Sequence, residues 1–552
     1  MDSSTTPAEA SVRPDVEPAP ALYARNASGM VREVSLVDML AYNAAAASGT
    51  GMALVIGLFF AFAAFPGANL YVALPLALAA IGVVWVTFGL LSATFPRAGG
   101  DYLYGSRVIH PVVGLASHLA VFLSTILAVG LWGVFMVNAG LAPTFAIIGL
   151  TTNHPWWVHA SETISQKGWT LAIAFGAIAL MSLLSMLRTK LVARVMTWSL
   201  AIGTLGFFIA VIVLIFTKSS SLESTINAFS EPYTATKDTY GATIAAGAKQ
   251  GLHYPSVDGY SLRGTLGACI VGLNLTMFYF WGAYMSGEMK GAGRRSRQLT
   301  AILGAGYIQG IIVIAAAFIF IHTIGYNFFA AANAGAYDVP VTPYYNFFAA
   351  VASGSSALSI IMGLTFLGFL LPGLYINSSL VQRSLFAWSF DGILPRRLSS
   401  VSERTRTPVV AIATIAVLGL GCSAFLIYAS NVGQILAVTA ALLVPPVLVA
   451  GIAGLLLPSR LPHLYRNGPA DWKVGGISVL RPVSMLCLLL GLVWGFGIMY
   501  FHAEFGVSRW YVMPACLLGC AIVAIVWYAL ASAVRRREGV ELKYVYGSIP
   551  PE

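Results

Sequence analysis

Charged side chains are the scarcest class in this sequence. Only 9% of the 552 residues are Asp, Glu, Lys or Arg, whereas 58% are hydrophobic. So little polar surface could not cover a water-soluble protein of this length, and the composition is typical of a protein embedded in a membrane. The five cysteines lie in apolar stretches without metal-ligand or paired-loop spacing, so we interpret them as small packing residues.

Several functional motifs are also missing. No G-x-x-x-x-G-K-[ST] sequence for a nucleotide is present, which argues against ATP-driven transport within this chain. A metal-ligand cluster, a nucleophile–base pair and paired midplane acids are absent too, so we do not predict an enzyme. We attribute the net charge of +10 to membrane topology and contact with anionic lipid, and find no reason to propose a nucleic acid partner.

Long apolar segments are what the sequence has in abundance. Crossing about 30 Å of hydrocarbon takes ~20 helical residues, and segments of that kind recur twelve times. The predicted spans are 37–65, 71–95, 112–147, 169–187, 191–217, 264–287, 299–325, 355–390, 408–429, 434–457, 483–501 and 510–534. This pattern predicts an all-α polytopic membrane protein with twelve transmembrane helices.

The basic residues predict the orientation. If the N-terminus lies inside, all but six of the 31 Lys and Arg residues fall on the cytoplasmic side. This is the positive-inside pattern, so we predict a multi-pass protein of the cell membrane with both termini cytoplasmic. The first 30 or so residues, rich in Pro, Ala, Ser and acidic groups, lack the order of a cleavable signal and are expected to be disordered.

A small-residue break, Ser48-Gly49-Thr50-Gly51, interrupts the first span. In hydrocarbon, backbone without hydrogen-bond partners is tolerated only beside a cavity or buried protein, so we expect this break to form half of a solute site. The sixth span has a counterpart, in which Gly272 precedes a polar-aromatic cluster from Phe278 to Tyr284. Paired interruptions in corresponding spans indicate a transporter site between inverted repeats.

The five-span offset between the two breaks predicts the domain organisation. Spans one to five and six to ten form the two repeats, and spans eleven and twelve are peripheral. The predicted parts are a cytoplasmic tail 1–35, a transport core 36–458 with repeats of about 36–217 and 264–458 around an outer loop 218–263 without an obvious fold, helices eleven and twelve within 459–534, and a cytoplasmic tail 535–552. Pro445-Pro446 should kink span ten.

Three stretches, in order, resemble motifs of the amino acid/polyamine/organocation (APC) superfamily of permeases. They are Gly49-Thr50-Gly51, the loop from Phe95 to Tyr102, and the segment from Arg383 to Pro395 followed by Arg406-Thr407-Pro408. The resemblance covers about residues 35 to 455 and implies a leucine-transporter-like fold, with a 5+5 inverted repeat plus two peripheral helices, that works by alternating access. The loop after span two is either solvated or covers the inner mouth of the pathway.

The resemblance also implies a substrate site. The α-carboxylate of an amino acid would meet backbone N–H groups between Ser48 and Gly51, and its α-amino group would meet carbonyls at both breaks, as the dipoles of half-helices favour. A leucine at position 51 is expected to fill the space where backbone meets carboxylate. The family places a gating aromatic near Phe278. The candidate substrate-binding residues are Ser48, Gly49, Thr50, Gly51, Phe278, Phe280, Trp281, Gly282 and Tyr284.

The absence of charged residues near the membrane midplane limits which substrates the site could bind. The nearest ionisable groups, Asp38, Glu288 and Arg383, lie toward the cytoplasmic ends of their spans. A dicationic substrate would need a buried carboxylate, so we predict a permease for a neutral amino acid. Tyr284 stands where many family members carry an acid. The alternatives are a non-transporting amino acid sensor or receptor on the same fold, and an amine or cationic amino acid exchanger.

No cofactor is predicted, and the coupling ion stays open between sodium and protons, as does pure exchange. The lysine that some family members carry in helix five has no counterpart in Leu200 to Thr204. His118 and His322 could titrate near neutral pH, although we interpret both as structural. A sodium site could combine hard oxygen ligands, but serine pairs more often bond their own backbone. Its candidates are Ala46, Ala47, Ser378 and Ser379. The direction of flux and the oligomeric state also stay open.

Overall fold

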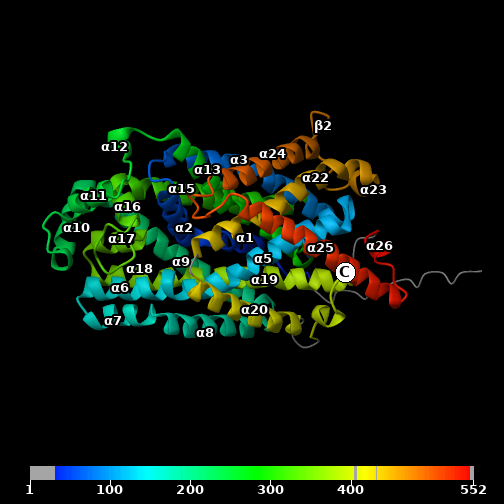
Figure 1. Cartoon of the computed structure of the whole chain (residues 1–552), viewed down its shortest axis with the longest axis horizontal. Coiled ribbons are helices and arrows are strands. Elements are labelled where there is room, and N and C mark those ends of the chain that lie inside the picture. The colour runs from blue at the N-terminus through cyan, green and yellow to red at the C-terminus, as the bar shows by residue number, and fades with distance from the viewer. Residues whose placement is uncertain (1–31, 188, 403–406, 430–431, 548–552) are drawn as a thin grey trace, which may run out of the picture.

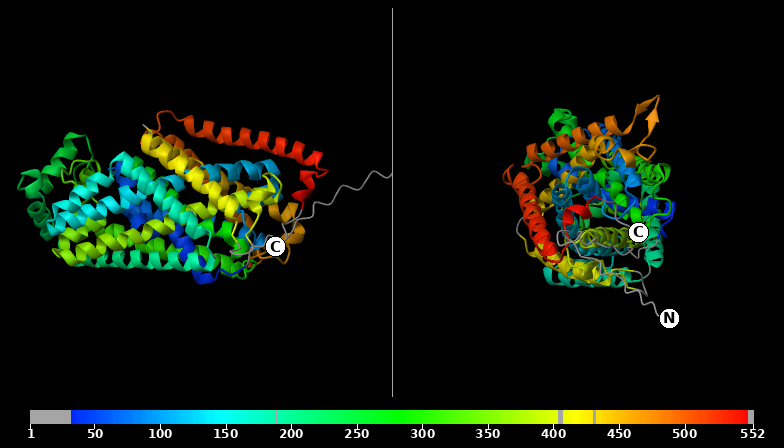
Figure 2. Two further views of the ribbon diagram at one scale, coloured as in Figure 1. Left: turned by 90° about the horizontal axis from the view of Figure 1, so that it is seen from below. Right: turned by 90° about the vertical axis from the view of Figure 1, so that its right-hand side faces the viewer.

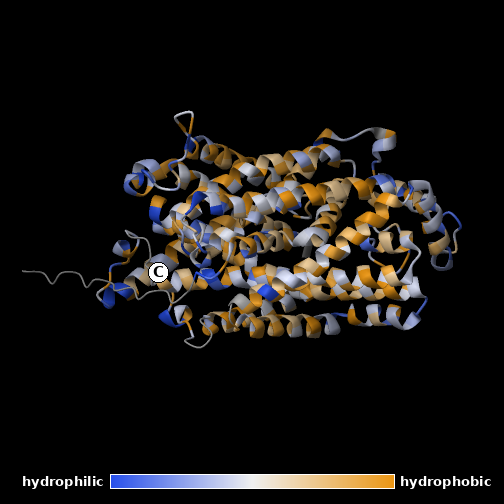
Figure 3. Ribbon diagram, turned by 180° about the vertical axis from the view of Figure 1, so that it is seen from behind, coloured by the Kyte–Doolittle hydropathy of each residue, from blue (hydrophilic) through white to orange (hydrophobic). Residues whose placement is uncertain are grey.

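The computed structural model of the chain describes residues 32–187, 189–402, 407–429 and 432–547. Most of the predicted N-terminal tail, and Arg406 of the third motif, lie outside these residues. Within the described residues, twelve helices are long and apolar enough to cross a membrane. Apolar residues dominate their middle portions, and polar residues gather at the two ends of the molecule (Figure 3).

The helices agree closely with the predicted spans, and several consist of more than one element. In chain order they are α1 (Leu36–Ala46) with α2 (Gly49–Ala64); α3 (Leu70–Thr94); α5 (Pro111–Phe135), η2 (Met136–Leu141) and α6 (Ala142–Thr152); α8 (Lys167–Ser185); α9 (Thr189–Phe216); α13 (Leu262–Thr276) with η3 (Met277–Glu288); α14 (Arg295–Leu299), η4 (Thr300–Gly304) and α15 (Ala305–Ile324); α18 (Ser356–Phe366), η5 (Leu367–Phe369) and α19 (Leu370–Phe390); α20 (Val409–Tyr428); α21 (Val432–Ala441) with α22 (Val444–Arg460); α24 (Leu480–Tyr500); and α25 (Val512–Arg537).

The two ends of the bundle differ, and we name them by their connections. The basic end carries the connections 95–110, 289–294, 391–408 and 461–479 and the described C-terminal residues. Its small elements are α4 (Asp101–Tyr104), η1 (Gly105–Ile109), η6 (Arg396–Ser399), α23 (Pro462–Tyr465), the hairpin β1 (Lys473–Val474) and β2 (Ile477–Ser478), and α26 (Leu542–Val545). The opposite, loop-rich end holds α7 (Pro155–Ile164), α10 (Ser219–Thr234), α11 (Thr239–Lys249), α12 (Pro255–Asp258), α16 (Tyr326–Asn333) and α17 (Tyr345–Ser353).

The prediction that the outer loop 218–263 lacks a fold is wrong, because it contains α10, α11 and α12, which gather at one end of the molecule in Figure 1. Leu222 and Ile226, four residues apart, are buried on one face of α10. That helix packs against α11, α15 and α17. The Ser/Thr-rich composition hid a helix with a narrow apolar stripe.

Burial within the bundle differs from span to span. The apolar window of the first span is 72% buried and those of spans three and six are 67% buried, whereas those of the last two spans are 28% and 17% buried. Figure 2 shows α25, in red, lying along the outer edge of the bundle. Span four, at 22%, is as exposed as the last two spans, so burial alone does not separate the predicted core from the predicted peripheral helices.

Spans one and six run antiparallel and are hydrogen-bonded to each other beyond both of their ends. Before α1, the N–H group of Val34 donates to the carbonyl of Glu288 at 3.0 Å, and Lys290 donates back to Val34 at 2.9 Å. After α2, the carbonyl of Gly67 accepts from Ser261 at 2.9 Å. The start of one span is thus tied to the end of the other, which is the relation expected between the first helices of inverted repeats.

The predicted interruptions of spans six and ten both correspond to a change in helix geometry. In span six, α13 continues as an α-helix past Gly272 to Thr276, and the polar-aromatic cluster from Phe278 to Tyr284 lies in the 3-10 helix η3. In span ten, the predicted kink is confirmed, since α21 ends at Ala441 and α22 begins at Val444, immediately before Pro445. A 3-10 helix as long as the 12 residues of η3 is unusual and often marks a hinge.

Two buried ion pairs close the basic end. Arg107 of η1 forms an ion pair with Asp391, with 2.7 Å between Nη1 and Oδ2 and side chains 3% and 1% exposed. Arg383 of α19 pairs with Glu288 at the end of η3, also at 2.7 Å. Asp101 is fully buried as well, so the loop after span two is not solvated. It packs against the basic end of the bundle, and the alternative that it covers the inner mouth of the pathway stays a prediction.

The pair between Arg107 and Asp391 joins the connection after span two, five residues beyond the second motif, to the third motif at the end of span eight. Tyr546 lies 4.9 Å from the guanidinium and shares a hydrogen bond of 3.0 Å with Tyr102. Burial alone would lower the pKa of Arg107, but the carboxylate of Asp391 raises it above its ordinary value, so the arginine stays charged.

Asp391→Asn should therefore lower the free energy of unfolding by about 3–5 kcal/mol, because it leaves a buried guanidinium without its counter-charge. Thermal unfolding in detergent should show an apparent Tm several degrees below that of the wild type. The matched control is Glu541→Gln, which removes one partner of the exposed pair with Lys543 and should leave the apparent Tm close to that of the wild type, because exposed ion pairs contribute little to stability. Equal effects of the two variants would contradict the prediction.

Candidate functional site

The break in the first span consists of two consecutive residues in the left-handed region. Ser48 has φ 70° and Gly49 has φ 67°. For serine this conformation costs roughly 1–2 kcal/mol, so surrounding contacts must hold it. α1 ends just before these residues and α2 begins at Gly49, with no side-chain cap on its first turn. The first N–H groups of α2 therefore have no intrahelical acceptor, and its N-terminus carries partial positive charge.

A cavity of about 420 Å³ lies beside this break. It extends from Ala46, Ala47 and Ser48 to Glu504 and Phe505 in the connection after α24. Its walls come from both halves of span one, from α5, from α13 and η3, from α19 and from α21. The cavity thus runs from the break toward the loop-rich end, and it is large enough for an amino acid and water.

The walls of the cavity are mostly apolar. Aromatic and aliphatic side chains dominate; they include Phe59, Phe60, Leu127, Leu131, Trp132, Phe135, Ile270, Leu275, Phe278 and Trp281. Glu504 contributes a carboxylate only at the loop-rich end, where it forms an ion pair with Arg263. The part of the wall near the break carries no ionisable side chain.

Two asparagines that the sequence analysis did not single out line the cavity near the break. Asn274 on α13 and Asn377 on α19 both have a buried side-chain oxygen without a hydrogen-bond partner. The amide nitrogen of Asn377 donates to the carbonyl of Gly373 at 2.8 Å, which fixes its orientation. Only the spacing of polar residues on otherwise apolar helices could have identified them. Such acceptors are suited to an ammonium group or another donor.

The structure divides the nine candidate substrate-binding residues into two groups. Ser48, Phe278 and Trp281 line the cavity. The others pack elsewhere: Gly49 and Gly51 face Phe369, Thr50 is buried with its hydroxyl unpaired, Phe280 stacks on Phe88 with 3.9 Å between ring centroids, Gly282 donates to Asn43 at 2.7 Å, and Tyr284 donates to Asp101 at 2.9 Å.

The expectation that a leucine at position 51 would fill a carboxylate site stays a prediction, and the structure adds a packing constraint at this position. A Cβ at Gly51 would overlap the hydroxyl of Tyr345 and the ring of Phe369. A Cβ at Gly49 would overlap the same ring, with Leu200 beside it. These glycines allow span one to approach its neighbours closely, and neither of them lines the cavity.

The candidate sodium ligands are divided between two surroundings. Ala46 and Ala47 line the cavity. The hydroxyl of Ser378 donates to Leu374 at 2.9 Å, and that of Ser379 donates to Ile376 at 2.8 Å and contacts Tyr42. Both serines thus bond their own helix backbone, the alternative that the sequence analysis raised for them. Within the described residues, no cluster of His, Cys, Asp or Glu suits a metal ion.

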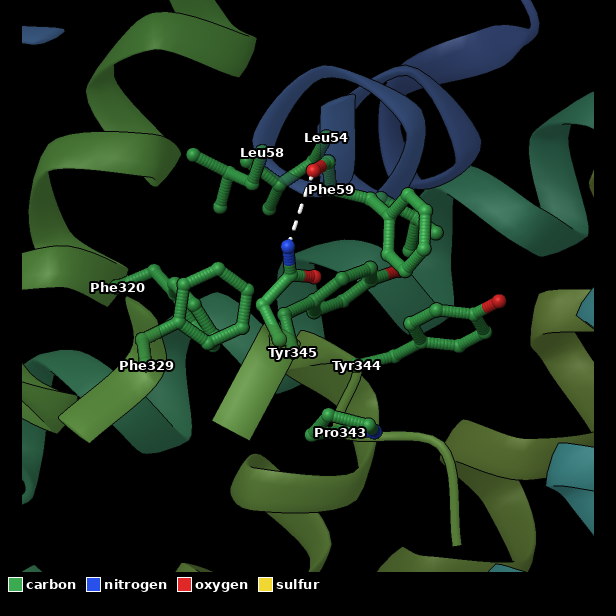
Figure 4. Close-up of a pocket in the computed structure, with 10 residues that line it drawn as sticks. Leu54, Leu58, Phe59, Phe320, Phe329, Pro343, Tyr344 and Tyr345 are labelled. Carbon is green, nitrogen blue, oxygen red and sulfur yellow. Dashed lines mark hydrogen bonds between the residues drawn. The ribbon is translucent and has the colours of Figure 1, made fainter. Parts of the chain in front are cut away.

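Two much smaller cavities flank span one. One of about 30 Å³ lies between α1, α9 and α19 toward the basic end, and has room for only a few water molecules. The other, of about 10 Å³, lies where Leu54, Leu58 and Phe59 face Tyr344 and Tyr345 (Figure 4). There Asn333 donates to the carbonyl of Phe59 at 3.1 Å.

A Gly51→Ala substitution should destabilise the fold because its methyl group would overlap Tyr345 and Phe369. The matched control is Gly57→Ala on the same helix, whose Cβ would meet only the flexible side chain of Leu275, at 3.2 Å. Alanine is favoured over glycine in a helix by about 1 kcal/mol, so the control should be neutral or stabilising. Thermal unfolding in detergent measures both variants, and a Gly51→Ala protein as stable as Gly57→Ala would contradict this packing.

A comparison with protein-family models identifies the family of the chain. A protein-family model described as "Amino acid permease" matches residues 40–530, which include both broken spans and the walls of the cavity. A search of curated proteins found no match. The all-α architecture with twelve membrane-spanning helices is the one predicted from the sequence. The chain is therefore a multi-pass membrane protein that belongs to the amino acid permease family of the APC superfamily.

Proposed function

We propose that this permease is a secondary active transporter that moves a neutral amino acid with an apolar side chain by alternating access. The observation that carries the proposal is the uncapped N-terminus of α2 beside an apolar cavity that has no ionisable side chain near the break. A zwitterion has no net charge to balance, so backbone dipoles and side-chain amides can satisfy its two charged groups.

The parts of the substrate find complementary groups around the break. Its carboxylate matches the free N–H groups of the first turn of α2, as anions do at helix N-termini. Its ammonium group matches the carbonyls at the end of α1 and the unpartnered oxygens of Asn274 and Asn377. An apolar side chain would lie against Phe278 and Trp281, whose rings are 5.0 Å apart.

The same features weigh against the alternatives. A cationic substrate would lack a carboxylate near the break, because Glu504 lies at the far end of the cavity and is paired with Arg263. A sensor differs from a transporter in that it would bind the ligand without moving it, and the transport assay described next separates the two. With the basic end cytoplasmic, as the positive-inside rule favours, the cavity faces outward and the basic end forms the inner gate.

The test is uptake and counterflow of a panel of radiolabelled amino acids in proteoliposomes, with sodium and proton gradients imposed separately. Apolar neutral amino acids should show saturable movement and compete with one another, whereas lysine and glutamate should not compete. Binding without movement would favour the sensor, and lysine as the best substrate would favour the exchanger. A dependence on sodium would support the site at Ala46, Ala47, Ser378 and Ser379.

Phe278→Ala should raise the KM for apolar amino acids about tenfold, since it removes an aromatic wall of the cavity worth ~1.4 kcal/mol. The matched control is Phe280→Leu, two residues further along η3. Its ring stacks on Phe88 away from the cavity, so the folded fraction should keep its KM even if less protein folds. If the two variants change the KM equally, Phe278 does not contact the substrate.

A further inference from the structure

A buried cluster of polar side chains around Asp101 lies between the cavity and the basic end. The carboxylate of Asp101 accepts hydrogen bonds from the Ser117 hydroxyl, from His118 Nδ1 at 2.8 Å and from the Tyr284 hydroxyl at 2.9 Å. Asp101 and His118 are 0% exposed, and Tyr284 is 1% exposed. His118 Nε2 has no hydrogen-bond partner, so this nitrogen is the one atom of the cluster at which a proton can be gained or lost without breaking a bond.

No fixed positive charge balances Asp101. Among the described residues, no Lys or Arg lies within ion-pair distance of its carboxylate, and Arg107 is paired with Asp391. The other groups that face the pair are neutral: the rings of Tyr102, Tyr284 and Trp388 lie 5.7, 5.7 and 5.5 Å from the ring of His118, and Tyr104 is close to Asp101. A buried carboxylate is costly without a counter-charge, and only protonated His118 supplies one here.

The 3-10 geometry of η3 links this cluster to the substrate cavity. Residues three apart on a 3-10 helix lie on the same face, about 6 Å along the axis. Phe278, Trp281 and Tyr284 therefore form one stripe: the first two line the cavity, and the third bonds to Asp101. His118 is on α5, which lines the same cavity at Ser124. The pair thus lies between the cavity and the basic end, covered by a half-helix that borders the substrate.

We propose that His118 is the proton-binding site that couples this permease to a proton gradient, with Asp101 as its counter-ion and Tyr284 as the link to η3. The proton binds at Nε2, making an imidazolium beside the Asp101 carboxylate, and leaves from the same atom as the neutral imidazole re-forms. The protonated pair is neutral overall and suits the closed, buried arrangement. Loss of the proton leaves a net negative charge, which favours movement of η3 and entry of water.

The burial of the pair makes the coupling strict, because a proton cannot exchange while η3 covers it. Protonation and the change of conformation are then steps of one cycle. This proposal rests on the proposed transport function, since it assigns the ion that drives it. It requires no lysine in span five, where the sequence has none.

The experiment compares the wild type with His118→Gln in proteoliposomes. In the wild type, an imposed gradient of one pH unit should change the steady-state accumulation of an apolar amino acid by up to about tenfold, the limit for one proton per substrate. Substrate addition should also change the pH reported by a dye trapped inside. His118→Gln should lose both effects and keep counterflow, because exchange needs no net proton movement. The matched control, His322→Gln, changes an exposed histidine of α15 and should behave as the wild type.

The outcomes separate the two proposals. No counterflow of any amino acid in the wild type would overturn the transport function and the coupling with it. Active counterflow without proton dependence, or proton-driven accumulation that survives in His118→Gln, would overturn the coupling alone. If His118→Gln does not fold, Tyr284→Phe removes only the hydroxyl bond to Asp101. It should keep counterflow and shift the pH of half-maximal uptake, and an unchanged pH profile would overturn the proposal.

Discussion

The constraint on which this structure depends is that backbone polar groups inside a membrane need partners. An uninterrupted helix provides a hydrogen-bond partner for every backbone group in its interior. In span one the helix is interrupted by a left-handed turn at Ser48 and Gly49, so some backbone groups there lose their partners. The turn is affordable because protein surrounds it on one side, where Phe369 and Tyr345 contact the glycines, and a cavity borders it on the other. The freed groups place backbone polar atoms beside a mostly apolar cavity wall.

Much of the architecture could be predicted because membrane spans are encoded by long-range composition. The span positions follow from that composition, whereas the break at Ser48 and the kink before Pro445 follow from local glycine and proline residues. The orientation of side chains at the site does not. Gly49, Gly51, Phe280 and Gly282 lie within the predicted breaks yet face helix neighbours, because the rotation of each half-helix is set by packing. Asn274 and Asn377 went unnoticed for the same reason.

The cluster around Asp101 illustrates a second limit of sequence reasoning. Asp101 and His118 are 17 residues apart, on either side of a turn and a helix start, and an acid in a basic connection resembles ordinary solvated loop. Burial comes from Tyr284 and Trp388, which belong to the other repeat. The partner of Tyr284, Asp101, lies 183 residues away in the chain. The change from α-helical to 3-10 geometry aligns Tyr284 with Phe278 and Trp281. No single residue type in the sequence predicts this change.

The backbone hydrogen bonds at Val34 and at Gly67 have a mechanical consequence. They join spans one and six beyond both ends, so these two broken helices form a closed loop of four half-helices whose corners are the two breaks and the two junctions. A tilt of one half-helix is passed to the half-helix tied to it, as in a parallel linkage. Opening at the loop-rich end and closing at the basic end would then be two results of one rotation of the linked half-helices. A substrate at the breaks would lie near the axis of that rotation.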